Sequence, residues 1–190
     1  MKKDPLEPMQ LATLLQRCQS GEVAAIQDLV RANQSAVFRL ALSILDDPAD
    51  AEEATQDTFL AVLRALDKYR GDSTFTTWLY RITVNVCRSQ LRKRQAKARI
   101  LQMLQSLSRL MGVSPTHPEE IVIQGENNAV LWKAVNTLDE KHRLPIILYY
   151  YHDLSVTEIA GVLGLREGTV LSRLYTARER LRAELNNSAS

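Results

Sequence analysis

The 190-residue sequence predicts an all-α protein made of two small helical domains joined by a flexible linker. Apolar residues recur at helical spacing through most of the chain, which is typical of amphipathic helices. Seven glycines and six prolines are few for an all-β protein, which needs many turns. A segment rich in Gly, Ser and Pro, GVSPTHPEE at residues 112–120, separates the two halves.

Four helices are expected in the first half of the chain. Their ranges are 8–18, 22–45, 49–68 and from a cap at Ser73 or Thr74 to Arg94 or beyond. Ser20-Gly21 ends the first helix, and Asp46-Asp47-Pro48 ends the second.

Four shorter helices are expected in the second half, in NNAVLWKAVNTL, HRLPIILYYYHD, SVTEIAGVLG and REGTVLSRLYTARERLRAEL. Pro145 either sits inside the second of these or kinks it. The expected domains are residues 1–95 and 126–186, with a linker at 96–125 in which ILQMLQSLSRLMG could be helical.

Charge is unevenly distributed along the chain, although the formal net charge is only +2. Between Asp72 and Glu119 there is no acidic residue, and eight Arg or Lys fall in that interval together with aromatic residues. Directly upstream, DDPADAEEATQD at residues 46–57 has six acids and no base. A basic surface with interleaved aromatics indicates nucleic acid with some strand opened. The acidic block indicates a basic protein surface as its partner.

The basic helix that starts near Thr74 has two distinct faces. An apolar stripe of Phe75, Leu79, Ile82 and Val86 is expected to lie in the core. A face rotated by about 130° is suited to follow a phosphate backbone and read a base edge, and it consists of Arg81, Asn85, Arg88 and Arg92. Trp78 lies between the faces, where its ring can be half packed and half available for stacking. The alternative is a solvated basic face beside a core Trp.

The helix expected at 49–68 has an acidic face opposite its apolar one. The helix macrodipole alone favours acids in the first turn. Gln56 and Asp57 continue the face beyond that turn, however, which the dipole does not readily explain. The expected docking face therefore consists of Asp50, Glu53, Gln56 and Asp57.

A helix-turn-helix of the DNA-reading type is expected near the C-terminus. Ser155-Val156-Thr157-Glu158 is a capping box, Ala160 permits a close helix crossing, and Gly164 supplies the turn. Its small core is expected to contain Ile159, Ala160, Leu163, Leu165, Val170 and Leu174. The exposed positions of its second helix are Glu167, Thr169, Ser172, Arg173 and Thr176, followed by Arg178, Arg180 and Arg182. An ordinary αα-hairpin is the alternative.

Several classes of protein are disfavoured. No stretch approaches the roughly 20 apolar residues of a membrane span, and MKKDPLEPMQ has no signal-peptide core, so a cytoplasmic protein is expected. Cys18 and Cys87 lack a CxxC partner or a nearby His, so reduced core thiols are expected and no metal site. The three histidines, His117, His142 and His152, are scattered, and no nucleophile–base set or Gly-rich phosphate loop is found. No catalytic residue and no cofactor are therefore expected.

These segments together resemble the bacterial sigma-70 family of transcription initiation factors, in particular its small extracytoplasmic-function group. Residues 50–94, DAEEATQDTFLAVLRALDKYRGDSTFTTWLYRITVNVCRSQLRKR, are similar to domain 2 of that group. Residues 154–182, LSVTEIAGVLGLREGTVLSRLYTARERLR, are similar to its domain 4. The resemblance spans nearly the whole chain apart from the first residues and the linker, and the two motifs in this order are highly specific.

The resemblance implies that the acidic face docks on the clamp helices of the RNA polymerase β′ subunit. It implies that the turn at 70–77 and the helix after it recognise and melt the −10 promoter element, through Arg70, Thr74, Trp78, Arg81, Asn85, Arg88 and Arg92. It also implies that the second helix of the helix-turn-helix enters the major groove at −35, through Arg166, Thr169, Ser172, Arg173, Thr176 and Arg178. A cognate anti-sigma protein is a further implied partner, and any metal would belong to that protein.

The sequence departs from the group at two positions of the expected −35 helix. Leu171 stands where a basic residue is common, and Thr176 where Arg is frequent, so phosphate contacts are expected to fall on Arg166, Arg173 and Arg178. The alternative function is a helix-turn-helix regulator that binds duplex operators without polymerase. The basic face with Trp78 and the acidic face disfavour that alternative.

Overall fold

The computed structural model describes residues 8–110 and 129–188, and within these ranges every regular element is a helix. The predicted all-α fold is therefore confirmed. The chain divides into two compact units, whose main boundary lies between Arg88 and Ser89 inside a long helix. Each unit is described by itself.

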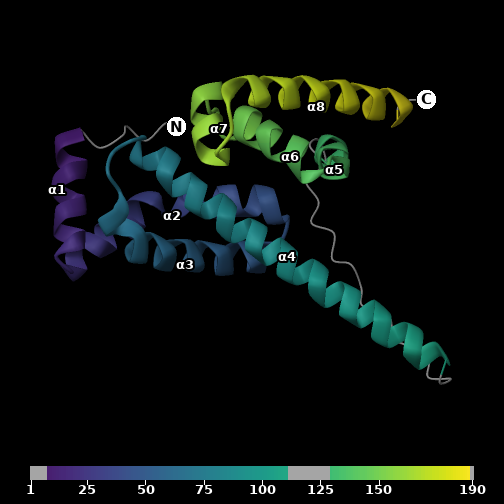
Figure 1. The fold of residues 1–190 in the computed structure, drawn as a ribbon, viewed down its shortest axis with the longest axis horizontal. Coiled ribbons are helices and arrows are strands. Elements are labelled where there is room, and N and C mark those ends of the chain that lie inside the picture. Colours follow the sequence, from purple (N-terminus) through teal and green to yellow (C-terminus); the bar gives the residue numbers. More distant parts are fainter. Residues whose placement is uncertain (1–7, 111–128, 189–190) are drawn as a thin grey trace. The chain divides into compact units, whose positions relative to one another are not determined.

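Three helices and the start of a fourth form most of the first unit (Figure 1). They are α1 (Pro8–Gln19), α2 (Val23–Leu45), α3 (Pro48–Ala65) and α4 (Phe75–Leu110). The bounds agree with the expected helices, except that a 3₁₀ turn, η1 (Leu66–Lys68), replaces the last turn of the third. Helix α4 also continues past Arg94 through much of the expected linker. Residues 111–128, which hold the GVSPTHPEE segment, lie outside the described residues.

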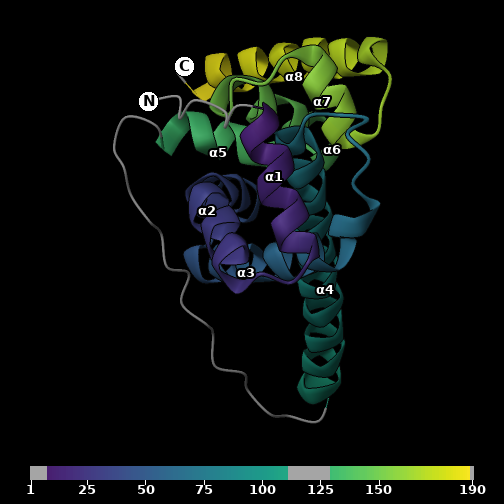
Figure 2. The same ribbon diagram turned by 90° about the vertical axis from the view of Figure 1, so that its left-hand side faces the viewer.

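A tight corner joins α2 to α3. Asp46 ends α2 in the left-handed conformation, with φ at 57°, and its backbone N–H donates to the carbonyl of Leu42. Asp47 then caps α3, because its carboxylate accepts a 2.8 Å hydrogen bond from the N–H of Asp50, and Pro48 takes the first helical position. Asp tolerates the left-handed region better than most residues. The corner therefore returns α3 alongside α2 (Figures 1 and 2).

The buried face of α4 differs from the predicted apolar stripe. Phe75 and Leu79 are buried as expected, but Ile82 and Val86 are only half-buried. The buried positions after Leu79 are Tyr80, Thr83, Val84 and Cys87. Thr83 tolerates burial because its hydroxyl donates to the carbonyl of Leu79 at 3.0 Å. The predicted stripe was therefore wrong at Ile82 and Val86, because packing against the neighbouring helices buries the side of α4 that carries Tyr80, Thr83, Val84 and Cys87.

Both cysteines are free and buried, as core thiols were expected to be. Burial raises the pKa of the Cys87 thiol to about 12. The thiolate, which is the reactive form, is therefore negligible at neutral pH, and Cys87 acts as a small apolar side chain.

The four helices that were expected in the second half form most of the second unit (Figure 2). They are α5 (Ala129–Thr137), α6 (Glu140–Ile146), α7 (Val156–Leu163) and α8 (Glu167–Ser188). Pro145 lies inside α6, directly before a π-helical turn, η2 (Ile147–Tyr151). The most fully buried side chains here include Leu144, Leu148, Ile159 and Leu174.

The predicted capping box starts α7. The hydroxyl of Ser155 accepts a 3.2 Å hydrogen bond from the N–H of Glu158. In return, the Glu158 carboxylate accepts a 2.8 Å bond from the N–H of Ser155. Two backbone donors that a helix N-terminus leaves unpaired are thus satisfied.

Ser155→Ala is predicted to lower the free energy of unfolding of the second unit by about 1 kcal/mol, because the cap on Glu158 is lost. Urea unfolding followed by circular dichroism measures this difference. Ser172→Ala is the matched control, since Ser172 is exposed in the interior of α8 and Ala has the higher helix propensity. An unchanged urea midpoint for Ser155→Ala would show that the box contributes nothing to stability.

Candidate nucleic-acid and protein interfaces

The predicted docking residues line one side of α3. Glu53 and Gln56 are exposed, and Asp50 and Asp57 are half-buried. The opposite side of the same helix is buried, through Ala51, Ala54, Thr55, Thr58, Phe59 and Val62. Asp50, Glu53, Gln56 and Asp57 are called the acidic ridge below. The ridge carries three carboxylates within eight residues, so a partner surface must be basic to match it.

Three aromatic rings pack together where the chain turns into α4. The ring centroids of Tyr69 and Trp78 are 5.1 Å apart, those of Phe75 and Trp78 5.7 Å, and those of Tyr69 and Phe75 5.8 Å. Trp78 is half-buried, as expected, so part of its ring stays available to a ligand. Tyr69 was not among the predicted site residues, although its position beside the turn was visible in the sequence.

The turn between η1 and α4 is held by two hydrogen-bonding side chains. The hydroxyl of Tyr69 donates to the carbonyl of Ser73 at 2.9 Å. The hydroxyl of Thr74 accepts a 3.2 Å bond from the N–H of Thr77 and so caps α4. Gly71 takes a positive φ of 78° within the turn, and Arg70 beside it is exposed. Thr74, predicted to contact DNA, thus also has a structural role.

The rings of Tyr69, Phe75 and Trp78 are called the aromatic cluster below. The predicted basic face follows α4 from this cluster onward. Arg81, Asn85 and Arg92 are exposed and Arg88 is half-buried. Arg81, Asn85, Arg88 and Arg92 are called the basic stripe below. Its members are three or four residues apart, so they lie in one line on the helix. Cations in a line, with an amide among them, suit a polyanionic backbone with one polar group left to read a base.

Helices α7 and α8 form the predicted helix-turn-helix. Gly164 ends α7 in the left-handed conformation (φ 66°, ψ 39°), and its N–H donates to the carbonyl of Ala160. Glycine adopts this conformation without steric cost, which explains its place at the turn. The predicted core residues Ile159, Ala160, Leu163, Val170 and Leu174 are buried, and Leu165 is half-buried.

The polar residues predicted to read DNA occupy the accessible side of this motif. Arg166, Thr169, Ser172 and Arg178 are exposed, and Arg173 and Thr176 are half-buried. Leu171 and Tyr175 on the same helix are also exposed. Within the described residues the guanidinium groups of Arg166 and Arg173 have no hydrogen-bond or ion-pair partner. These two arginines can therefore meet phosphate without giving up an internal contact.

Arg178 is instead held by a tyrosine pair in η2. Its Nε donates to the hydroxyl of Tyr150 at 2.8 Å, and its guanidinium carbon is 5.6 Å from the ring centroids of both Tyr149 and Tyr150. Such cation–π contacts stabilise by about 0.5–1 kcal/mol at exposed sites. The sequence spacing held no signal for this contact, because it joins residues that are 28 positions apart.

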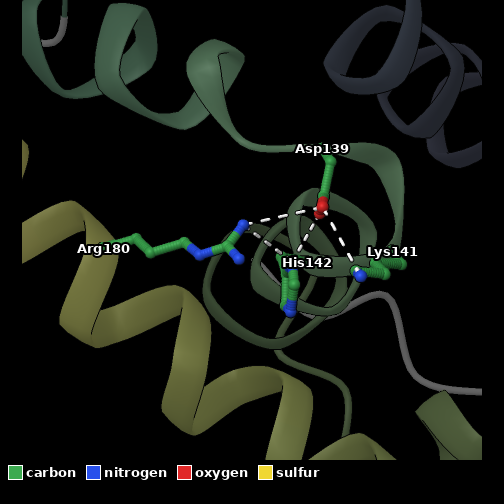
Figure 3. A network of polar contacts seen from close by, with 4 residues as sticks. All are labelled: Asp139, Lys141, His142 and Arg180. Carbon is green, nitrogen blue, oxygen red and sulfur yellow. Dashed lines mark hydrogen bonds and ion pairs between the residues drawn. The ribbon is translucent and has the colours of Figure 1, made fainter.

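A polar network ties α8 to the start of α6 (Figure 3). Arg180 Nη1 lies 3.5 Å from Asp139 Oδ2 and 3.3 Å from His142 Nδ1, and Lys141 Nζ lies 3.8 Å from Asp139 Oδ2. His142, whose side chain is buried, also bonds to Asp139 through Nδ1. Desolvation raises the pKa of Asp139, but the hydrogen bond from His142 and the nearby cations lower it more, so it lies below its usual value. Arg182 in turn pairs with Glu179 at 2.9 Å.

Two further observations bear on the kind of site. In residues 8–110 and 129–188, no three His, Cys, Asp or Glu side chains gather in a way that would hold a metal ion. None of the helices in that part of the chain combines the length and the hydropathy of a membrane span.

Two family models match the chain in order. The model described as "Sigma-70 region 2" matches residues 29–97, and that described as "Sigma-70, region 4" matches residues 129–181. The first match contains the acidic ridge, the aromatic cluster and the basic stripe. The second contains α5 to α7 and most of α8.

Similar curated proteins carry related names. The chain is 33% identical over 174 residues to the "ECF RNA polymerase sigma factor SigE" of Mycolicibacterium smegmatis, covering 90% of this chain and 66% of that protein. It is 31% identical over 173 residues to the "RNA polymerase sigma-H factor" of Pseudomonas aeruginosa, covering 87% of this chain and 89% of that protein. It is 33% identical to the "ECF RNA polymerase sigma-E factor" of Escherichia coli K12, with the same coverage of 87% and 89%.

Two solved structures have a similar fold. One is CnrH in complex with the cytosolic domain of CnrY, with a TM-score of 0.65 and 30% identity over 92% of this chain and 96% of that chain. The other is the sigma factor RpoE in complex with the anti-sigma factor NepR from Bartonella quintana. Its TM-score is 0.62, with 26% identity over 86% of this chain and 98% of that chain. Because both family models match in order, and relatives above 30% identity align over most of their length, the chain belongs to the extracytoplasmic-function group of the sigma-70 family of transcription initiation factors.

Proposed function

We propose that this protein binds core RNA polymerase and directs it to promoters by recognising their −10 and −35 elements. Residues 1–95 bind the polymerase and the −10 element, and residues 126–186 bind the −35 element. One observation supports this proposal most strongly. The acidic ridge and the basic stripe, which begins at the aromatic cluster, occur on the same chain as a helix-turn-helix. A regulator that reads only duplex operators needs the last of these features and neither of the others.

The acidic ridge docks on a basic surface of the polymerase, the clamp helices of its β′ subunit. Its side chains point away from the buried side of α3, so docking requires no rearrangement of the core. Complementary charge of this kind raises the rate of encounter and fixes orientation. The chain acts as a binding factor and performs no chemistry of its own, so it works where the polymerase is, in the cytoplasm.

The −10 element is recognised at the start of α4. Trp78 and Tyr69 provide rings against which an unpaired base can stack, and Arg70 beside them is exposed to meet a phosphate. The basic stripe holds the backbone of the same strand. Asn85 offers a donor and an acceptor among the cations, which makes it the residue suited to read a base edge.

The −35 element is read as duplex by α8. A recognition helix contacts base edges through its N-terminal residues, and Thr169 and Ser172 are placed there, with Thr176 one turn after Ser172. Arg166 and Arg173 contact phosphate, since neither is engaged within the described residues. Arg178 is already bonded to Tyr150 and positions α8 on η2.

The two similar structures were solved with partner proteins, one named as an anti-sigma factor, which supports a cognate anti-sigma protein as a further partner.

Purified protein added to core polymerase is expected to give promoter-specific transcripts, whereas the double variant Glu53→Lys with Asp57→Lys is not. Reversing two charges of the acidic ridge opposes docking. Glu53 is exposed and Asp57 is half-buried on the side of α3 that faces away from the core, and surface substitutions of this kind change stability by only about 0.5 kcal/mol. In vitro transcription and competition for core polymerase against the wild-type protein measure the effect.

The matched control for that experiment is Asp28→Lys with Asp67→Lys, which reverses two exposed acids of the first unit outside the ridge. Normal competition by the ridge variant would show that docking uses another surface. Absence of promoter-specific transcripts from the wild-type protein would contradict the proposed function itself.

Asn85→Ala is predicted to impair recognition of the −10 element more than binding to DNA in general. The cations of the basic stripe still hold phosphates in this variant, while the group that reads the base is lost. Stacking contributes about 1–3 kcal/mol per base whatever the base is, so discrimination needs a polar side chain. The measurement compares affinities for single-stranded −10 oligonucleotides that carry the preferred or a substituted base. A variant that keeps the full preference would place the reading group in the 70–77 turn.

Arg173→Ala is predicted to weaken binding to −35 duplex and to reduce the slope of log K against log salt by about 0.9, the value for one lost phosphate contact. Its urea midpoint should not change. Arg178→Ala should lower the urea midpoint, because the contact with Tyr149 and Tyr150 is lost. Titrations at several salt concentrations, together with urea unfolding, separate the two roles. An unchanged slope for Arg173→Ala would move the DNA-binding face elsewhere on α8.

A further inference from the structure

Helix α8 exposes two large apolar side chains among its polar residues. Leu171 is 55% exposed and Tyr175 is 67% exposed. A single exposed leucine on a helix is ordinary, because leucine is a good helix former and many apolar side chains remain at protein surfaces. Tyrosine is a poorer helix former, so helix propensity does not account for Tyr175. The pair therefore indicates an apolar surface with a use of its own.

The two side chains lie on the same side of the helix. Tyr175 follows Leu171 by one turn and is rotated from it by only about 40°. The residues that α8 packs into the core of the second unit are others, among them Val170, Leu174 and Ala177, all of which are buried. Leu171 and Tyr175, called the apolar edge below, are thus not needed to hold α8 on its unit.

The apolar edge borders the residues that are proposed to meet DNA. At about 100° per residue, Ser172 follows Leu171 around the helix, and Arg173 follows Ser172 by the same angle. Thr176 is rotated by about 40° from Ser172 and lies between it and Arg173. The accessible side of α8 therefore has three parts in order: the apolar edge, small hydroxyl groups and a cation.

We propose that Leu171 reads a thymine of the −35 element by packing against its C5 methyl group. The inference rests on the proposed function, which places α8 in the major groove. The base edges there offer hydrogen-bond donors and acceptors, apart from the methyl group of thymine, which is apolar. Leucine can neither donate nor accept a hydrogen bond, so thymine is the base that it favours. The −35 element then carries a thymine beside the bases that Ser172 and Thr176 contact.

The test uses the full chain and the −35 duplex that the wild-type protein selects from duplexes of random sequence. Each thymine of that duplex is replaced in turn by deoxyuridine, which lacks the methyl group but keeps the same oxygen acceptor and the same pairing with adenine. Affinities are compared at one salt concentration, because phosphate contacts make binding salt-dependent. The proteins are the wild type, Leu171→Ala, and the matched control Leu131→Ala, which shortens a leucine of α5 that is 47% exposed.

Deoxyuridine at one position is expected to weaken binding of the wild type about fourfold, the factor for one buried carbon group. Leu171→Ala should bind the unmodified duplex less tightly and should lose its sensitivity to that replacement, whereas Leu131→Ala should keep both the affinity and the sensitivity. Such coupling between two changes is the mark of a direct contact.

Two results would overturn the proposal: a wild type that is indifferent to every replacement, or a Leu171→Ala variant that keeps the full penalty. Failure of the wild type to enrich any duplex would instead contradict the proposed reading of the −35 element.

Discussion

The period of a single helix determines the layout of the first unit. On α4, Leu79, Val84 and Cys87 are buried, while Arg81 and Asn85 are exposed. A helix of 3.6 residues per turn places these two sets of side chains on different sides, so their separation needs no other structural feature. Packing one side into the core therefore fixes the direction in which the other presents its charges. The aromatic cluster has its place in this arrangement because Phe75 and Trp78 belong to the first turn of the same helix.

Segregation of charge gives this nearly neutral chain two surfaces of opposite sign. The acids of residues 46–57 cap and line α3, and the cations that follow Asp72 line α4. Mixing the two signs on either helix would create local ion pairs, and neither surface would then attract a charged partner. Keeping them apart gives α3 an acidic surface and α4 a basic one. The cost in stability is small because both surfaces face solvent.

The second unit uses its arginines for two different purposes. Arg178 and Arg180 hold α8 against η2 and the start of α6, through Tyr150 and through Asp139. Arg166 and Arg173 have no such contact in the described residues. A helix that enters a groove must be oriented firmly, since a small rotation moves every reading side chain. The engaged arginines hold α8 in place, and in the proposed function the other two are the ones that meet DNA.

The sequence by itself determined the helices, the caps at Thr74 and Ser155, most of the helix-turn-helix core and the family, because these depend on local spacing and on residue type. It also placed the acidic ridge and the basic stripe on the exposed sides of their helices. The tertiary structure alone decided that Thr83 and Tyr80, not Ile82 and Val86, face the core. It also brought Tyr69 to Trp78, Arg178 to Tyr150 and Arg180 to His142. The last two contacts join residues 28 and 38 positions apart. Packing between helices decides such pairs, and no period along one helix encodes them.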